Sequence, residues 1–564
     1  MTRTKTWTAL FAAAAMALTL AACGANKTDD TSSDAATGGD TSTDTSTDAG
    51  TDTGTDTATD GDDAGTDSGT ATGSKVVIVS AADPGNLDPQ MSVVGAAFEL
   101  AFYAYDSLLG TNASGEVQAQ LAKEWTYEGS TAVFTMNEGI TCSDGSELTA
   151  QTVADNINWA ENPENASPYL GVFLPAGITA TADNAAGTVT FELAVPAPFL
   201  LETLSNFPIV CDAALADRSL MTSATVGSGP YELVEAAPED HYTYVRRDGY
   251  TWGPGGATTA EAGQPDTVEV RIVANESTAV DLLLAGDVNV VTTVGTDGAR
   301  AAAAGLSGVE VNALLGESWY NHAEGHPTAD QAVRIALTQA VDLDTLASVI
   351  TGGEGSRTTM MAVVPPTPCI YDATTGYLPT YDPDGVVATM EAAGYTKDGD
   401  GLWTKDGAAV VVKFLYDSLL GTTGQAAAEL AMEQWQAAGF TIEPSELDTT
   451  RLSEVLFGSG DWDIAWEPVN LMSPDQGVGF LSGLTVAEGG ANFSEITNEA
   501  YTTAMTEALA KTGADSCTSF QAAEQALYQV ADFVPWAVRP NMIYYSGTTY
   551  EYVGHTQVTT LRVG

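Results

Sequence analysis

The spacing of hydrophobic and polar positions changes between the strand period and the helix period along residues 75–564. Residues 75–80, KVVIVS, form a short β-rich run. Residues 188–195 alternate apolar and polar positions, which predicts a half-buried strand that Pro196 ends. Residues 96–110 instead repeat apolar side chains at helical spacing, which predicts a helix with one buried face. The apolar positions of that helix are Phe98, Phe102, Tyr105 and Leu109.

Longer stretches show strands and helices in alternation. In residues 120–160 we predict two strands and then a helix whose N-cap is Thr149. Residues 266–291 have the pattern of strand, helix and strand, and residues 326–350 that of two consecutive helices. Because strands and helices alternate over the whole body, the sequence predicts a mixed α/β architecture.

The first residues have the features of an export signal. Arg3 and Lys5 give a positive start, and residues 7–22 form a run without charge that ends at Cys23. This is the pattern of a secretory signal peptide, so we expect residues 1–22 to be removed. Residues 20–23, Leu-Ala-Ala-Cys, resemble the bacterial lipobox, in which the cysteine becomes the first mature residue and carries lipid. No later apolar run reaches the roughly 20 residues of a membrane-spanning helix.

Residues 23–74 are predicted to be a disordered tether. Twelve aspartates lie among Thr, Ser, Gly and Ala between Asp29 and Asp67, without an aromatic or large aliphatic residue. Such a segment buries too little apolar surface to offset chain entropy, and like charges keep it extended. We expect it to hold a folded body off the outer face of the cell membrane, with the lipid on Cys23 as the sole membrane contact.

Composition limits the classes of partner. The 490 residues after the tether are enough for two or three domains. The net charge is −56, and residues 1–74 hold three basic and twelve acidic side chains, which leaves −47 on the body. Nucleic acid and anionic lipid surfaces would repel such a protein, so we expect no nucleic-acid partner.

Four cysteines remain besides Cys23, an even number in an oxidising compartment, and they permit two disulfides in three connectivities. They are Cys142, Cys211, Cys369 and Cys517. Because no Cys-x-x-Cys pair occurs, zinc binding and thiol redox chemistry are disfavoured.

Three short motifs have some features of chemical sites. Gly227-Ser228-Gly229 is followed by proline and no lysine, so phosphate binding is disfavoured. Residues 398–401 lack a third acidic ligand and a closing glutamate, which favours a hairpin turn over a calcium loop. His322 and His326 have the spacing of a metal pair, but Gly325 and Pro327 place them in a loop, where solvated histidines are favoured.

Catalysis is disfavoured as well. The chain has four histidines, no Gly-x-Ser-x-Gly elbow and no paired His-Glu motif on a helix. We therefore expect no catalytic residue, no bound metal and no cofactor.

The order of several short motifs resembles the large extracytoplasmic solute-binding proteins of the oligopeptide, dipeptide and nickel importers, solute-binding family 5. The similarity extends from Val76 to about Ser546. The motifs that carry it are Leu87-Asp88-Pro89, Leu121-Ala122-Lys123-Glu124-Trp125, Ser143-Asp144-Gly145, Gly227-Ser228-Gly229-Pro230-Tyr231, Asn321, Val333-Arg334, Ala340-Val341-Asp342, Tyr381-Asp382-Pro383 and Asp461-Trp462-Asp463.

The resemblance implies an α/β fold of the periplasmic-binding-protein type, with two lobes and a ligand cleft between them. It implies a discontinuous lobe one with an inserted domain, and a lobe two that closes on the solute by hinge motion. The implied bounds are 75–110 with 226–318 and 530–564 for lobe one, 111–225 for the inserted domain and 319–529 for lobe two. The partners it implies are a peptide or other small solute and the permease subunits of an ABC importer, to which we expect a monomer to deliver its cargo.

Two disulfides follow from these bounds, because Cys142 with Cys211 and Cys369 with Cys517 would each lie within one domain. The resemblance also implies ligand-binding residues near the lobe crossing, namely Trp319, Tyr320, Asn321, Trp462, Trp466, Glu467 and Asn470. Peptide receptors usually carry an aspartate shortly after a tryptophan in this region, and Val469 stands there instead. Glu467 is the candidate partner for a cargo amine. A sensory receptor and a nickel or metal-chelate receptor remain the alternative functions.

Overall fold

The structure is a computed structural model that describes residues 74–564 except 93–94, 172 and 296. The predicted signal peptide, the lipid-bearing Cys23 and the tether up to residue 73 lie outside the described residues. Within the described part, no helix has the length and apolar character needed to cross a membrane.

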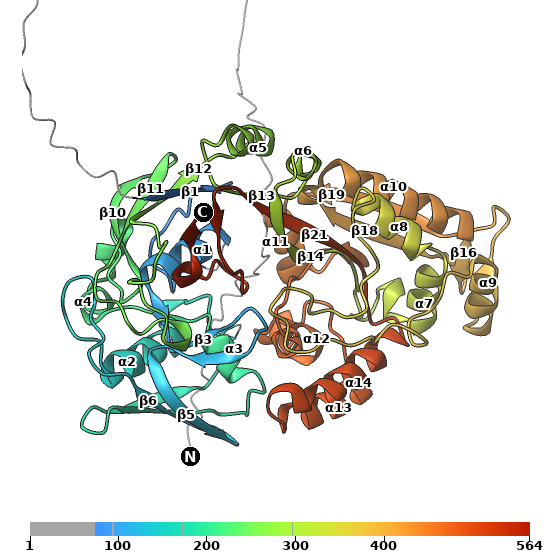
Figure 1. Ribbon diagram of the computed structural model, residues 1–564. Helices are drawn as coiled ribbons and strands as arrows, with labels where there is room; N and C mark the ends of the chain where they lie inside the picture. Colours follow the sequence, from blue (N-terminus) through green and yellow to red (C-terminus); the bar gives the residue numbers. More distant parts are fainter. Residues whose placement is uncertain (1–73, 93–94, 172, 296) are drawn as a thin grey trace, which may run out of the picture. The chain divides into compact units, whose positions relative to one another are not determined.

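A ten-stranded mixed sheet runs through the described chain (Figure 1). In spatial order its strands are β10 (Tyr231–Ala237), β11 (His241–Arg246), β12 (Thr267–Ile272), β1 (Lys75–Ser80), β13 (Val290–Thr293), β21 (Phe533–Tyr545), β14 (Ser307–Tyr320), β20 (Ile464–Trp466), β18 (Val411–Asp417) and β19 (Thr441–Leu447). Strand β1 pairs in parallel with β12 and β13, and β18 pairs in parallel with β19 and β20.

The long strands β14 and β21 connect the two halves of this sheet. They pair antiparallel from Ser307 to Trp319, and β21 also pairs with β13 while β14 also pairs with β20. Their register shifts on both sides of Gly316. A Cβ added at Gly316 would lie 2.4 Å from the ring of Trp536, so the close approach of the two strands there requires glycine.

The two largest hydrophobic cores lie along the sheet, one in each lobe. Lobe one packs on a core that includes Val76, Phe134 and Tyr244. Lobe two packs on a core that includes Trp319, Phe414 and numerous other residues between 319 and 537. The first core is continuous between the ten-stranded sheet and a smaller four-stranded sheet, so the two sheets of lobe one are held together by shared apolar burial.

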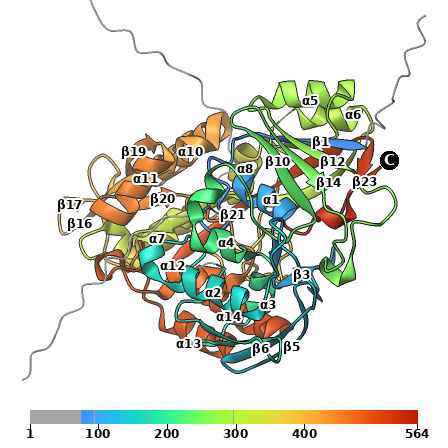
Figure 2. The same ribbon diagram turned by 90° about the vertical axis from the view of Figure 1, so that its left-hand side faces the viewer.

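The smaller sheet of lobe one is antiparallel. Its strand order is β5 (Ala122–Glu128), β6 (Thr131–Met136), β8 (Thr188–Glu192) and β7 (Thr179–Asp183). Helix α2 (Ala150–Glu161) packs on β7 and β8, and Figure 2 shows it above this sheet. Other elements of lobe one are α1 (Gly95–Ala104), β2 (Asp106–Ser107), β3 (Leu109–Thr111), β4 (Val117–Ala119), α3 (Leu200–Leu204), β9 (Pro208–Ile209), α4 (Asp212–Ala216), α5 (Glu276–Ala285), α6 (Gly298–Ala303), β22 (Thr548–Thr549) and β23 (Arg562–Val563).

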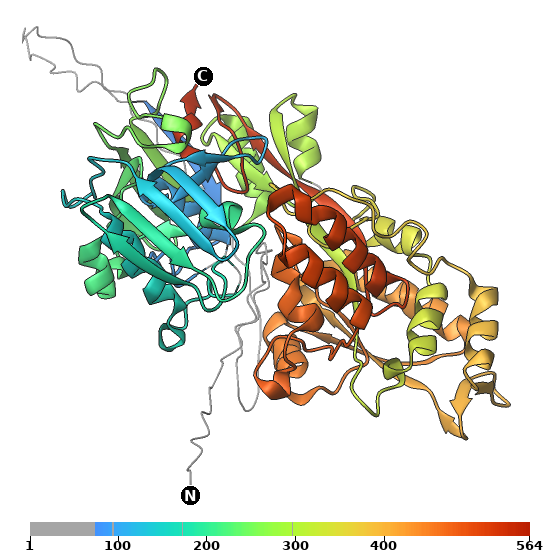
Figure 3. The ribbon, with the colours of Figure 1, turned by 90° about the horizontal axis from the view of Figure 1, so that it is seen from below.

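Lobe two carries most of the longer helices. They are α7 (Gln331–Gln339), α8 (Leu343–Ile350), α9 (Pro383–Ala392), α10 (Gly421–Ala438), α11 (Thr449–Glu454), α12 (Val478–Ser482), α13 (Glu499–Leu509) and α14 (Cys517–Tyr528). Helices α13 and α14 pack side by side, as the two red helices in Figure 3 show. A small antiparallel sheet is formed by β15 (Thr396–Lys397), β16 (Trp403–Lys405) and β17 (Ala408–Ala409).

The sequence-based helix boundaries are largely confirmed. Thr149 caps α2 and accepts a hydrogen bond from the amide of Thr152. Asp382 caps α9, Pro383 is its first residue, and Gly394 follows its end with a φ of 85°. Residues 398–401 form the hairpin turn between β15 and β16, as predicted.

Two predicted elements are shorter than their patterns indicated. The helix predicted over 96–110 ends at Ala104, because Asp106 and Leu109 pair with other strands in β2 and β3. The strand predicted over 188–195 ends at Glu192, which is the last residue with a partner on β6. Val195 is therefore 55% exposed rather than half buried. In both places tertiary pairing outweighs the local period.

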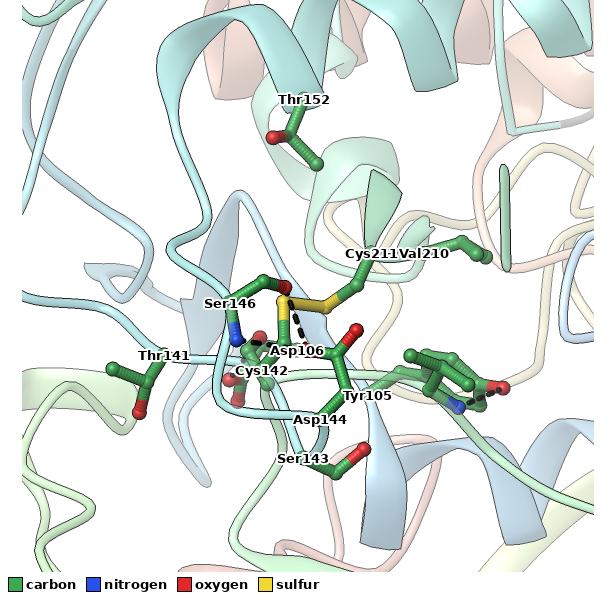
Figure 4. The surroundings of a disulfide bond; sticks show 12 residues. Tyr105, Asp106, Thr141, Cys142, Ser143, Asp144, Ser146, Thr152, Val210 and Cys211 are labelled. Carbon is green, nitrogen blue, oxygen red and sulfur yellow. Dashed lines mark hydrogen bonds between the residues drawn. A yellow bond between two sulfur atoms is a disulfide. The ribbon is translucent and has the colours of Figure 1, made fainter. Parts of the chain in front are cut away.

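The structure pairs Cys142 with Cys211 and Cys369 with Cys517, the two pairs predicted from the sequence. Figure 4 shows the first bond, beside the turn in which the Ser146 amide donates to the Asp144 carboxylate. The first disulfide closes 69 residues of chain within lobe one, and the second closes 148 residues within lobe two.

The Gly227-Ser228-Gly229 segment has a structural role. A Cβ at Gly227 or Gly229 would lie within 2.4 Å of the Ala104 backbone, so the segment passes too close to α1 for other residues. The Ser228 hydroxyl donates to Asp106, whose buried carboxylate also accepts from three other side chains. These donors are Gln120, Tyr250 and Trp252.

Candidate functional site

The strands of lobe two bring three carboxyl groups to one edge of the sheet. Strand β18 ends at Asp417, and Glu467 follows the last residue of β20. Strand β14 runs antiparallel to β20 with Trp319 opposite Ala465, so the same register places Glu317 beside Glu467. The carboxyl ends of parallel strands are where α/β sheets commonly bind ligands. This edge is therefore the first candidate for a binding site.

Glu317 is a fully buried acid on the crossing strand. Its Oε2 accepts hydrogen bonds from the Val469 amide at 2.7 Å and from the Trp319 indole at 3.2 Å. Among the residues that the structure describes, its Oε1 has no partner. Burial raises the pKa of Glu317 well above its usual value, and the nearby Glu467 adds to this effect.

Glu467 lies almost as deep, with 9% of its surface exposed. Burial and the neighbouring Asp417 raise the pKa of Glu467 to about 8. Its Oε2 is buried and has no hydrogen-bond partner within the described chain. At neutral pH and without ligand, this side chain is therefore mostly protonated.

The raised pKa of Glu467 makes the stability of the protein depend on pH. The folded, ligand-free protein holds a proton on Glu467 that the unfolded chain releases near pH 4.5, so this contribution to stability is present below about pH 4.5 and is lost as pH rises through about 8. Glu467→Gln keeps the uncharged form at every pH. Between pH 5.5 and 7.5, the variant should gain about 2 kcal/mol of unfolding free energy relative to wild type. Urea unfolding at both pH values measures the difference, and a gain independent of pH would contradict the assignment.

The three predicted tryptophans lie in the core of lobe two. The ring centroids of Trp319 and Phe533 are 4.3 Å apart, and those of Trp466 and Trp536 are 4.9 Å apart. Trp462 has no exposed surface, and its indole nitrogen has no hydrogen-bond partner in the described part of the chain. These side chains form the apolar wall behind the strand ends.

The remaining predicted residues hold local structure together. The Tyr320 hydroxyl bonds to Thr338 at 3.0 Å, and the Asn321 amide donates to the carbonyl oxygens of Gly460 and Trp462. The Asn470 side chain accepts from the Leu314 amide at 2.7 Å, which ties the loop after β20 to the crossing strand. Their assignment as ligand-binding residues stays a prediction.

Glu317 and Asp417 were not among the ligand-binding residues predicted from the sequence. Asp417 is 3% exposed and ends an apolar strand, while Glu317 interrupts the otherwise apolar end of β14 directly after Gly316. An acid beside a run of apolar residues was the signal that the sequence offered for each. Nothing in the sequence indicated that they lie near Glu467, because about 50 residues separate Asp417 from it and about 150 separate Glu317 from it.

Lobe one also touches lobe two away from the crossing strands. The rings of Phe199 and Phe520 stack with centroids 5.7 Å apart, and the Gly513 amide donates to the Pro198 carbonyl at 2.8 Å. A small cavity of about 20 Å³ lies at the boundary of the two lobes. It is lined from lobe one by Thr111, Gly115, Phe173, Glu202, Thr203, Ser205 and Asn206, and from lobe two by Pro366, Pro368, Met472, Ser473 and Gln476.

One loop connects the cavity with the carboxyl groups. It leaves β20 at Glu467 and reaches the cavity wall at Met472 and Ser473. The buried Oδ1 of Asn206, on the opposite wall, has no partner among the described residues. The strand edge and the cavity are therefore two separate candidate regions, since neither Glu317 nor Glu467 lines the cavity.

The loop is confirmed, but the prediction of solvated histidines is wrong for His322, whose side chain is 10% exposed, while His326 keeps 23% of its side chain exposed. His326 Nδ1 lies 2.8 Å from the Asp463 carboxylate, and His322 Nε2 lies 3.2 Å from the Asp532 carbonyl oxygen. Burial lowers the pKa of His322 to about 3. Within the described ranges, no three His, Cys, Asp or Glu side chains are grouped to hold a metal ion.

Two lobes on a continuous sheet, with polar groups at their boundary, are the architecture of a two-lobed solute-binding protein. The sequence matches the family described as bacterial extracellular solute-binding proteins, family 5 Middle, over residues 116–489. The chain belongs to this family, whose members are binding proteins. The dipeptide-binding protein of Escherichia coli is 26% identical over 463 residues, which cover 74% of this chain and 81% of that protein.

Solved structures show the same fold. A substrate binding protein from Microbacterium hydrocarbonoxydans, complexed with 4-hydroxybenzoate hydrazide, has a TM-score of 0.69 and 25% identity over 87% of this chain and 100% of that chain. The oligopeptide-binding protein AppA from Bacillus subtilis, in complex with a nonapeptide, has a TM-score of 0.65 and 19% identity over 87% of this chain and 99% of that chain.

Proposed function

We propose that this protein captures a peptide or a solute of similar size and delivers it to the permease of an ABC-type importer. The observation that carries the proposal is the pair Glu317 and Glu467, each with a buried oxygen that lacks a partner in the described chain, at the strand edge of a family 5 fold. The E. coli relative named for dipeptides supports the cargo class. A cargo that contacts both lobes favours the closed arrangement, and β14 and β21 are where the hinge acts.

Mass spectrometry of the compound released by denaturing the purified protein tests this function. We expect a peptide or similar solute in near-stoichiometric amount, and we expect its return to the emptied protein to raise the unfolding temperature. A compound that the protein converts to a product, or the absence of any stabilising solute in a broad screen that includes peptides, would contradict the proposal.

We further propose that the mature protein is a monomer tethered to the outer face of the cell membrane by lipid on Cys23. The lipobox-like sequence and the aspartate-rich residues 29–67 support this. The acidic tether keeps the receptor close to its permease and raises its effective concentration there.

Cys23→Ala should remove the anchor. We expect the variant to appear in the culture medium or to remain unprocessed, while wild type is found in the membrane fraction, because a residue without a thiol cannot carry the lipid. Fractionation with immunoblotting measures this, and Ala22→Gly is a control that keeps a small residue before the cysteine. Membrane attachment of the Cys23→Ala protein at the wild-type level, after normal processing, would contradict the prediction.

A further inference from the structure

A short strap of lobe one crosses to lobe two. It consists of residues 196–199, Pro-Ala-Pro-Phe, between strand β8 and helix α3. Its base is fixed to lobe one, because the Tyr127 hydroxyl on β5 donates to the Ala197 carbonyl and accepts from the Ala197 amide, both at 2.9 Å. Its tip contacts lobe two, where the Gly513 amide donates to the Pro198 carbonyl at 2.8 Å. The strap is thus bonded to a different lobe at each end.

Phe199, the last residue of the strap, belongs to the core of lobe two. It has no exposed surface, and its ring stacks on that of Phe520 of α14 with centroids 5.7 Å apart. The next residue, Leu200, is equally buried but belongs to the core of lobe one. Two consecutive side chains therefore fill the cores of two different lobes, and separation of the lobes would expose the Phe199 ring to water.

We infer that the strap is a latch that holds the two lobes together without cargo, with Phe199 as its anchor. The crossing strands join the lobes in every arrangement, whereas the strap joins them only when they are closed. Burial of one phenylalanine side chain favours the closed arrangement by roughly 10- to 100-fold. Pro196 and Pro198 each fix a φ angle, so the strap loses little conformational entropy when it docks. Cargo then enters only during openings in which the ring leaves the core of lobe two.

The receiving surface of lobe two is fixed by covalent and hydrogen bonds. Phe520 lies in the first turn of α14, and Cys517 at the start of that helix is bonded to Cys369. Gly513 has a φ of 52°, a left-handed conformation that glycine adopts without strain. The Ser516 hydroxyl donates to the Gly513 carbonyl at 2.6 Å and holds this turn. The disulfide and the turn therefore keep the stacking ring and the amide donor in place for the strap.

An acid pair beside the strap, Glu202 and Asp475, opposes closure. Glu202, in α3, lines the lobe-boundary cavity from lobe one, and Asp475 directly precedes Gln476, which lines it from lobe two. Burial raises the pKa of Glu202 to about 7, with Asp475 adding to the effect, and burial raises the pKa of Asp475 to about 6. Tyr127 of β5 faces both carboxyl groups, and the Ser473 hydroxyl donates to Asp475. Above pH 7 both acids carry charge and repel each other, so the latch must outweigh them.

Hydroxyl-radical footprinting of the cargo-free mature protein, with oxidation read by mass spectrometry, tests the latch. Phe173 of lobe one and Met472 of lobe two line the lobe-boundary cavity from opposite sides, so separation of the lobes exposes both. Phe134 and Phe414 lie in the cores of lobe one and lobe two with no exposed surface, and they are the internal controls, because only unfolding exposes them. The experiment needs no cargo, so its failure would leave the proposed function standing.

Phe199→Ala should increase the oxidation of Phe173 and Met472 about fivefold or more at pH 7.5, because without the anchor the closed arrangement is less populated. Two control variants should match wild type closely. Phe199→Leu keeps most of the apolar side chain, and Val195→Ala changes a residue that is 55% exposed and lies outside the strap. Adding Glu202→Gln to Phe199→Ala should lower the oxidation of both reporters again, because it removes one of the two charges that repel.

Three results would overturn the latch. The reporters Phe173 and Met472 could stay unchanged in Phe199→Ala, or they could already be fully exposed in cargo-free wild type. Oxidation of Phe414 together with both reporters would show that Phe199 only completes the fold of lobe two. If adding Glu202→Gln brings no decrease, the opposition assigned to the acid pair is overturned.

A second measurement decides if Phe199→Ala fails to fold. In wild type at urea concentrations below the unfolding midpoint, release of the latch should expose Phe173 and Met472 before Phe414, because the lobes separate before lobe two unfolds. Exposure of all three side chains at the same urea concentration overturns the latch.

Discussion

Arg334→Met will destabilise lobe two by about 3 to 5 kcal/mol, because it leaves a buried carboxylate without its cation. Arg334 is 5% exposed, and its guanidinium donates to Asp532 at 2.6 Å and to three backbone carbonyls. Those carbonyls belong to Thr328, Ala329 and Ala531. One side chain thus joins α7, the turn before it and the two residues that precede β21. Urea unfolding followed by tryptophan fluorescence measures the loss.

Two further variants separate charge burial from packing. Arg451 pairs with Glu454 in a contact whose side chains are 65% and 56% exposed, so Arg451→Met should cost less than about 1 kcal/mol. Burial raises the pKa of Asp532 in spite of the nearby arginine, which shows that desolvation dominates there. Adding Asp532→Asn to Arg334→Met should therefore recover part of the loss. If Arg334→Met costs no more than Arg451→Met, the ion pair does not stabilise the lobe.

Removal of the Cys369–Cys517 disulfide will lower the unfolding free energy of lobe two by roughly 4 to 5 kcal/mol. The bond closes 148 residues of chain, and in the chain-entropy model its loss returns that closure entropy to the unfolded state. Cys369→Ala with Cys517→Ala makes the change, and urea unfolding measures it. The Cys142–Cys211 bond closes 69 residues, so its removal should cost slightly less.

Reduction supplies the control for the disulfide experiment. Dithiothreitol should destabilise wild type and should leave a variant that also carries Cys142→Ala and Cys211→Ala unchanged, because that variant has no disulfide left to reduce. Peptide mapping of the oxidised protein should recover Cys142 linked to Cys211 and Cys369 linked to Cys517. Any other connectivity, or free thiols in the denatured oxidised protein, contradicts the pairing.

Local signals in the sequence predicted many of the elements. The capping residues Thr149 and Asp382 each begin a helix, and the turn at residues 398–401 joins two strands. These predictions succeed because caps, prolines and glycines act on the few residues beside them. The family was also recognised from the order of short motifs, and the match over residues 116–489 confirms it.

Positions that depend on distant pairing were predicted less well. Helix α1 ends early because the residues after it pair in β2 and β3, and strand β8 ends where its pairing with β6 ends. The tryptophans chosen for a ligand surface, Trp319, Trp462 and Trp466, have almost no exposed surface. An aromatic side chain gives the same pattern in a core and in a cleft, so sequence could not separate the two environments.

The sequence by itself determined the α/β class, the caps of α2 and α9, the export signal pattern, the charge of the body and the family. Each of these depends on composition or on neighbours within a few residues of chain. Only the tertiary structure decided that Glu317 on β14 lies beside Glu467 at the end of β20, each with an oxygen that lacks a partner among the described residues. That arrangement comes from the antiparallel register of β14 and β20, which joins segments about 150 residues apart, and strand register is set by the packing of the whole lobe.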